Sequence, residues 1–239
     1  MLSVVGEQKP QVEFPCGLHL DEYPNDRILQ AQTQKWFYEL TCLIRDKHRL
    51  TQFNELTSTL NKLGYFEAPA SHKYHLAKRG GLLVHHVGVT LVLIRMKRLL
   101  YPKITDESCV IVGLLHDVGK LGTPGRPYYD SRVDVSWKSG DPYAKQETGP
   151  LAPVYMGVAA RSLAVVSSKI DLSTWEAQAI LYHDGQYIDD NSGVKLKETP
   201  LTLLLHHADM WTAFQIEQTY PILDEPFTFV GHRGWSEVE

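Results

Sequence analysis

The segment from Leu82 to Leu100 constrains the fold most, because it is apolar on most helical faces until Arg95. A surface helix carries one apolar stripe, whereas a helix that is apolar all round is buried. This segment therefore predicts a central helix that other helices surround. The Gly80-Gly81 pair before it indicates a loop that leads the chain into the helix.

Helical periodicity recurs along the rest of the chain, and strand signals are scarce apart from a short candidate at 132–137. Three helix starts carry capping signals: Thr105, Ser173 with Glu176 three residues later, and Thr199 before Pro200. We predict an all-α fold. The expected helices, besides the central one, span about 25–49, 51–64 with Thr51 as N-cap, 105–120, 154–168, 174–183 and 200–220.

The length of 239 residues and the hydrophobic content of 43% allow one domain, or one domain with a helical extension. We expect one compact unit, in which residues 1–64 form an N-terminal arm and helices that pack on the core. The main helical domain then spans 65–220, and 221–239 form a C-terminal tail. Residues 123–153 are rich in proline, glycine and tyrosine. A loop this long in a compact domain is usually functional, so we expect a lid or a substrate-selecting segment.

Charge and cysteine content limit the classes of partner. The net charge is −4 and the pI about 6.3, so no basic field is present to hold duplex DNA by counterion release. The three cysteines are far apart and lack C-x-x-C spacing, which predicts neither a disulfide framework nor a thiolate zinc site. Apolar runs stop before the ~20 residues of a membrane span, and no signal pattern begins the chain. We therefore expect a cytoplasmic protein that has no membrane partner.

The pair His116-Asp117 follows an apolar run, in the sequence Gly-Leu-Leu-His-Asp-Val-Gly-Lys. Successive helical residues point about 100° apart, so both side chains reach one ion only at a helix end. The pair could instead form a simple C-terminal cap. Three further segments offer histidine or aspartate beside an apolar helix, at His85, at His183, and at His206 with Asp209. Imidazoles and carboxylates without thiolate suit a divalent ion such as Mn²⁺, Fe²⁺, Co²⁺, Ni²⁺, Zn²⁺ or Mg²⁺.

The order of these residues resembles the HD superfamily of metal-dependent phosphohydrolases. The frames Gly-Gly-Leu-Leu-x-His and His-Asp-x-Gly-Lys are similar to the branch that contains YhaM-type 3′-5′ exoribonucleases and related phage and bacterial hydrolases. The resemblance covers about residues 69–214. It implies an HD-domain helical bundle, here with an N-terminal helical extension and a long loop after the HD motif. It also implies the metal ligands His85, His116, Asp117 and Asp209.

Other histidines are candidates with weaker support. The frame selects His85 over His86, which would be a neighbour of the ligands or a surface residue. His183 could bind a second metal ion or a phosphate oxygen, but Met156 stands where the resemblance expects a further histidine, so one or two ions remain open. His206 shares a helix face with Asp209, and it is either a substrate contact or a satisfied core histidine. His75 resembles a position that is occupied in related hydrolases.

The chemistry that fits these residues is hydrolysis of a phosphoester. A divalent ion can lower the pKa of bound water from about 15.7 to about 7. We expect Asp117 to orient that water while it ligates, and Lys120 and His183 to stabilise the charge that develops on phosphate. Lys120 could instead be only a helix-dipole partner. The expected substrate contacts are His75, Lys120, His183 and His206.

The resemblance suggests a nucleotide phosphoester as substrate, in a small nucleotide or a short single-stranded nucleic acid. A small nucleotide is favoured because no second nucleic-acid-binding domain is visible. Four aromatic residues of the long loop could stack on a base or cover the core: Tyr128, Tyr129, Trp137 and Tyr143. Two alternatives belong to other classes, namely an HD-type di-iron oxygenase and a non-catalytic nucleotide-binding protein.

Overall fold

The computed structural model describes residues 26–72, 75–130, 144–145 and 154–217. The predicted arm at 1–24, the strand at 132–137, the tail at 221–239, Trp137 and Tyr143 lie outside these residues. The predicted all-α fold is confirmed, since the sheet in the described part is an antiparallel pairing of two residues from each strand. The elements in chain order are α1 (Asp26–Thr41), α2 (Lys47–Lys62), α3 (Gly81–Leu100), α4 (Asp106–Leu115), η2 (Val118–Leu121), β1 (Tyr129–Asp130), β2 (Ala144–Lys145), α5 (Val158–Ser167), α6 (Thr174–Leu181), η3 (Gly185–Tyr187), η4 (Asp189–Val194), α7 (Pro200–Trp211) and η5 (Thr212–Ile216).

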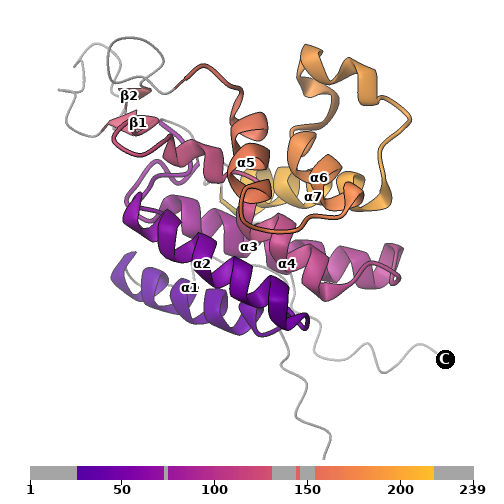
Figure 1. The fold of residues 1–239 in the computed structure, drawn as a ribbon, viewed down its shortest axis with the longest axis horizontal. Helices are drawn as coiled ribbons and strands as arrows, with labels where there is room; N and C mark the ends of the chain where they lie inside the picture. The colour runs from indigo at the N-terminus through magenta and orange to yellow at the C-terminus, as the bar shows by residue number, and fades with distance from the viewer. Residues whose placement is uncertain (1–25, 73–74, 131–143, 146–153, 218–239) are drawn as a thin grey trace, which may run out of the picture.

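Helix α3 lies at the centre, as its apolar sequence predicts. Every residue from 81 to 94 is buried, including His85 and His86. Helices α1, α4 and α7 pack directly on α3. In Figure 1, α1 and α2 lie on one side of α3 and α4, and α5, α6 and α7 lie on the other. The histidines of α3 are thus inside the bundle, where α4 and α7 can reach them.

Two glycines fix the start of α3. Gly80 has a positive φ of 76°, a conformation that is favourable for glycine alone among common residues. A Cβ on Gly81 would lie 2.1 Å from the carbonyl oxygen of Leu76, so only glycine lets the preceding loop fold back onto the helix start. The Gly-Gly part of the Gly-Gly-Leu-Leu-x-His frame therefore sets the position of α3 four residues before His85.

Three of the four predicted capping residues are confirmed. Ser173 and Glu176 form a capping box, and the hydroxyls of Thr105 and Thr199 accept hydrogen bonds from the third residue of their helices. The prediction of Thr51 as a cap is wrong. The carboxylate of Asp46 accepts hydrogen bonds from the amides of His48 and Arg49, so α2 begins at Lys47 and Thr51 lies inside it.

Several predicted helix ends are also wrong. The first helix ends at Thr41, about eight residues early, and α5 begins at Val158 instead of near 154. Helix α4 ends at Leu115 and α6 ends at Leu181, each just before a candidate site histidine. The predicted helix 200–220 stops at Trp211 and continues as the π-helical turn η5. Periodicity overestimates these helices because apolar spacing continues through the turns that follow them.

A partly buried network of ion pairs connects α2 with the starts of α4 and α6, the opposite ends of those two helices from His116 and His183. The guanidinium of Arg49 on α2 donates to Glu107 Oε1 at 2.7 Å on α4 and to Glu176 Oε2 at 2.8 Å on α6. The side chain of Glu176 is 1% exposed. Burial alone would raise the pKa of Glu176, but the hydrogen bonds from Arg49 and from the Ser173 amide lower it below its usual value.

We predict that Glu176→Gln lowers the free energy of unfolding by about 1–3 kcal/mol at neutral pH, because the partly buried Arg49 loses one of its two charged partners. The folded-state pKa of Glu176 is lower than its unfolded value, so its contribution is present above the ordinary pKa of 4.5 and is lost as the pH falls through the folded value. Urea denaturation should show that the difference from wild type shrinks in acid. Glu55→Gln, at an exposed position of α2, is the control. Equal stability of Glu176→Gln and wild type at neutral pH would contradict this role.

Candidate metal centre

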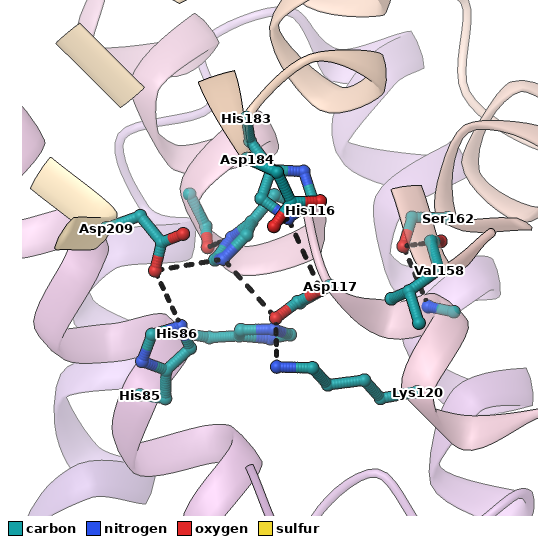
Figure 2. A network of polar contacts seen from close by, with 12 residues as sticks. His85, His86, His116, Asp117, Lys120, Val158, Ser162, His183, Asp184 and Asp209 are labelled. Atoms are coloured by element: carbon teal, nitrogen blue, oxygen red, sulfur yellow. Dashed lines mark hydrogen bonds and ion pairs between the residues drawn. The ribbon is translucent and has the colours of Figure 1, made fainter. Parts of the chain in front are cut away.

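The four predicted metal ligands lie together inside the bundle (Figure 2). Nε2 of His85 on α3 is 3.0 Å from Oδ1 of Asp209 on α7. Nε2 of His116, at the end of α4, is 3.9 Å from the same Asp209 oxygen and 3.9 Å from Oδ2 of Asp117. Ligands bound at about 2.1 Å to one ion are separated by roughly 3 Å. The ring of donor atoms is therefore slightly wider than a loaded site and needs only small side-chain shifts to close.

His116 shows most clearly that this ring suits a cation. Its Nδ1–H donates to the carbonyl of Gly113 at 3.0 Å, which directs the Nε2 lone pair toward the carboxylates. This Nε2 is buried and has no hydrogen-bond partner among the described residues. A buried polar atom without a partner costs about 1–3 kcal/mol. A divalent ion at the centre would satisfy it, so the residues present fit a metal ion with nitrogen and oxygen ligands.

The end of α4 lets two adjacent side chains face one centre. His116 still has helical backbone angles, with φ −58° and ψ −33°, whereas Asp117 has left the helix with φ −115° and ψ 14°. Within a regular helix the two side chains would point about 100° apart. The structure thus places the pair at a helix end, where both side chains can face one centre.

Gly119 in the His-Asp-x-Gly-Lys frame is needed for close packing. A Cβ there would lie 2.3 Å from the carbonyl oxygen of Val158 and 2.9 Å from Ser162 Oγ. The Gly119 amide donates to Ser162 Oγ at 2.9 Å, and Arg161 donates to the Gly119 carbonyl at 2.9 Å. Figure 2 shows Val158 and Ser162 beside the turn that carries Asp117 and Lys120. Packing of η2 on α5 therefore holds both residues in place.

We predict that Gly119→Ala destabilises the protein by about 1–3 kcal/mol, because the added methyl group forces η2 away from α5. The displacement should also weaken metal binding through Asp117. Thermal and urea unfolding, with a metal titration, measure both effects. Gly193→Ala is the matched control, because a Cβ at Gly193 meets no atom within 4 Å. Equal stability of the two variants would show that close packing at Gly119 does not stabilise the fold.

Lys120 contributes a positive charge next to Asp117. Its ammonium contacts Oδ2 of Asp117, and its side chain is 17% exposed. Burial opposes the charge of each group. The attraction between them prevails, so the pKa of Lys120 is above its ordinary value and that of Asp117 is well below it. Lys120 is therefore a cation and Asp117 an anion in the folded protein.

His183 follows the end of α6 and joins the same group of residues. Its Nδ1–H donates to the carbonyl of Ile180 at 2.8 Å, and its Nε2 lies 3.4 Å from Asp117 Oδ1 and 3.7 Å from Asp184 Oδ1. Burial acts to lower the pKa of His183, but the carboxylates of Asp184 and Asp117 raise it to about 9. In Figure 2, His183 and Lys120 approach Asp117 from different sides.

The imidazoles of His85 and His116 differ in charge: the first is protonated and the second is neutral. Burial would lower the pKa of His85, but Glu217 and Asp209 raise it to about 10, so the ring is an imidazolium between two carboxylates. Burial and the neighbouring His183 lower the pKa of His116 to about 3, so this ring stays neutral. The pKa of Asp209 is below its ordinary value, since the hydrogen bond and charge of His85 outweigh its burial. A cation bound at His85 Nε2 would therefore displace a proton.

Two other histidines have structural contacts. His206 Nδ1–H donates to the carbonyl of His183 at 2.7 Å, and the His206 ring fills the space where a Cβ of Gly185 would be. It lines a surface cleft with Tyr182, Gln186, Glu198 and His207. His86 is fully buried, and its Nδ1 donates to the hydroxyl of Tyr65 at 2.7 Å, so the surface interpretation of His86 is wrong.

The motif analysis missed Glu217, and it did not foresee that His75 lies beside this carboxylate. Both carboxylate oxygens of Glu217 lie 3.1 Å from Nδ1 of His85, and His75 Nε2 lies 3.8 Å from Glu217. Glu217 lies beyond the segment covered by the family resemblance. Its spacing of eight residues from Asp209 gives no usable signal, because the π-helical turn between them changes the direction in which Glu217 points.

No protein-family model matches the chain, and no curated protein or solved structure is significantly similar to it. None of the described helices combines the length and apolar character that crossing a membrane requires. The residues of the site and their geometry are therefore the basis for the functional argument.

We predict that the purified protein binds a divalent ion and that His116→Ala weakens this binding by more than about 100-fold, since it removes a central ligand. Isothermal titration with Mn²⁺ and Zn²⁺ on protein treated with chelator measures the affinity. His207→Ala, which removes an exposed histidine of α7, should bind as wild type does. Equal affinity of His116→Ala and His207→Ala would exclude His116 as a ligand.

Proposed function

We propose that the protein is a metal-dependent phosphohydrolase that cleaves a phosphoester of a nucleotide or a short oligonucleotide. One observation carries the proposal: four side chains from distant parts of the sequence converge on one centre, where Nε2 of His116 has no hydrogen-bond partner among the described residues. The four residues are His85, His116, Asp117 and Asp209. The order of these residues is that of the HD phosphohydrolases. A lysine next to the carboxylates supplies a cation for an anionic substrate.

The divalent ion would polarise a phosphoryl oxygen and make bound water more acidic. The protein residues then have separate tasks. Asp117 orients the attacking water by accepting a hydrogen bond from it. Lys120 stabilises the negative charge on the phosphoryl oxygens. His183, protonated beside Asp117 and Asp184, donates a hydrogen bond to the phosphate or the leaving oxygen.

Access to the site favours a small substrate. His85, His116 and His183 are at most 1% exposed, whereas the side chains of Asp209, Lys120 and Asp184 are 18%, 17% and 39% exposed. The site therefore opens to solvent beside these three side chains, and a phosphoryl group would enter there. Together with the net charge of −4, this favours a nucleotide or a strand end over duplex DNA.

Tyr128, near the start of the long loop, is poorly placed to stack on a base. Tyr128 is buried, and the guanidinium of Arg161 lies 5.0 Å from its ring centroid. Its ring centroid is also 5.0 Å from that of Tyr129. Tyr128 therefore covers the core beside α5, in agreement with the second of its two sequence interpretations.

We predict that the metal-loaded protein releases phosphate or a nucleotide in a screen of nucleoside mono- and triphosphates, cyclic dinucleotides and short RNA and DNA. Lys120→Ala should lower kcat/KM by about 100-fold or more, because it removes a charge that acts on the transition state. Its metal content should stay close to wild type. Lys103→Ala, at an exposed position, is the control. Undiminished activity of Lys120→Ala would remove Lys120 from the mechanism.

A di-iron oxygenase is the second candidate, and one observation favours it. His183 and Asp184 lie beside Asp117, where they could help to hold a second ion that shares Asp117. Anaerobic loading with Fe²⁺ followed by exposure to O₂ separates the two functions. Oxygen consumption without phosphate release in any substrate set would favour the oxygenase. Metal-dependent nucleotide binding without turnover would favour the non-catalytic alternative.

A further inference from the structure

Glu217 is a buried carboxylate on the outer side of His85. Its side chain is 1% exposed, and its two oxygens lie 3.1 Å from His85 Nδ1. A buried carboxylate costs several kcal/mol unless a charged or hydrogen-bonding partner compensates it. Among the described residues, His85 Nδ1 lies within hydrogen-bond distance of this carboxylate, whereas His75 Nε2 is 3.8 Å away and makes no hydrogen bond to it. The arrangement of His85 between Glu217 and Asp209 therefore places an acceptor at each ring nitrogen.

The backbone brings Glu217 to this position by a local break in α7. The amide of Glu217 donates to the carbonyl of Thr212 at 3.0 Å, five residues back, so the last turn is π-helical. One extra residue in a turn rotates the following side chains by about 100°, and such turns are frequent at functional sites. Gly88 on α3 permits the approach, because a Cβ there would lie 3.0 Å from Thr212 Cγ2.

We propose that Glu217 is a positioning residue for the metal ligand His85, and this inference rests on the proposed metal-dependent function. Glu217 accepts the Nδ1–H of His85, which fixes the ring orientation and leaves Nε2 to face the ion beside Asp209. The His75 ring lies on the other side of Glu217, with its Nε2 at 3.8 Å from the carboxylate and outside hydrogen-bond distance, so the bond to His85 is the interaction that defines this role. Outer carboxylates of this kind orient and strengthen histidine ligands, and their loss typically costs 10–100-fold in metal affinity.

A second cation held by His75, His85 and Glu217 is the competing explanation. Their donor atoms lie within 4.8 Å of one another. Such an ion would take Nδ1 of His85 while the first ion takes Nε2, which requires a fully deprotonated imidazolate. A hydrogen bond from Nδ1–H to Glu217 satisfies both groups without that cost, so the positioning role is the simpler account of the geometry.

The test uses Zn²⁺ titration and ¹⁵N NMR of the histidine rings in wild type, Glu217→Gln and Glu217→Leu. Gln retains an acceptor for Nδ1–H and Leu does not. We expect the Leu variant to bind Zn²⁺ about 10–100-fold more weakly, with Gln between Leu and wild type. In wild type and in the Gln variant, the ¹⁵N shifts of His85 should show a protonated Nδ1 and a metal-bound Nε2. Glu55→Gln should leave both readouts unchanged.

Wild-type affinity in Glu217→Leu, with the same His85 ring state, would overturn the inference while leaving the metal site intact. A second equivalent of Zn²⁺ that is lost in both His75→Ala and Glu217→Leu would overturn it in favour of a second cation site. Absence of Zn²⁺ binding in the wild type itself would instead overturn the proposed function, and this inference with it. Urea unfolding of each variant at neutral pH separates loss of metal affinity from loss of folding.

Discussion

The structure depends on placing charged and polar side chains inside a bundle whose central helix is otherwise apolar. Helix α3 is buried along 81–94, and His85 within it lies between the carboxylates of Asp209 and Glu217. Charges at such depth are stable only when they are paired and hydrogen-bonded. Lys120 with Asp117 and His183 with Asp184 satisfy the same requirement nearby. The buried Nε2 of His116 has no hydrogen-bond partner among the described residues, and a cation could satisfy it.

Helix ends bring these groups together. His116 and Asp117 follow the last turn of α4, His183 follows α6, and Glu217 follows the π-helical turn after α7. At a helix end the backbone is free to turn, so neighbouring side chains can face one centre, as a regular helix does not allow. Glycines at 81 and 119 allow the close backbone approaches that hold α3 and η2 in position. These glycines therefore allow the packing that positions His85 and Asp117.

The sequence predicted the all-α class, the central α3, and the starts of helices at Thr105, Ser173 and Thr199. Each of these depends on local signals, either an apolar run or a capping side chain. It failed at Thr51 and at the ends of α1, α4, α6 and α7. Those ends depend on contacts from distant residues, such as Glu107 accepting from the Arg45 and Asp46 amides. Such contacts are not visible in a local pattern.

The same distinction applies to the site. The order of His85, His116-Asp117 and Asp209 predicted residues that the fold does bring together. Glu217 was not predicted, because its contact with His85 depends on a π-helical turn that regular periodicity cannot reveal. For His86 the sequence left two interpretations open, and the structure agrees with the neighbour of the predicted ligands and not with the surface residue. The deciding contact is with Tyr65, which lies 21 residues earlier in another segment.

An anomalous difference map from crystals grown with Mn²⁺ shows whether these four residues bind a cation. We expect a peak at about 2.0–2.3 Å from Nε2 of His85, Nε2 of His116 and carboxylate oxygens of Asp117 and Asp209. No peak within this ring of residues, in crystals whose maps show the four side chains clearly, would mean that they do not form a metal site.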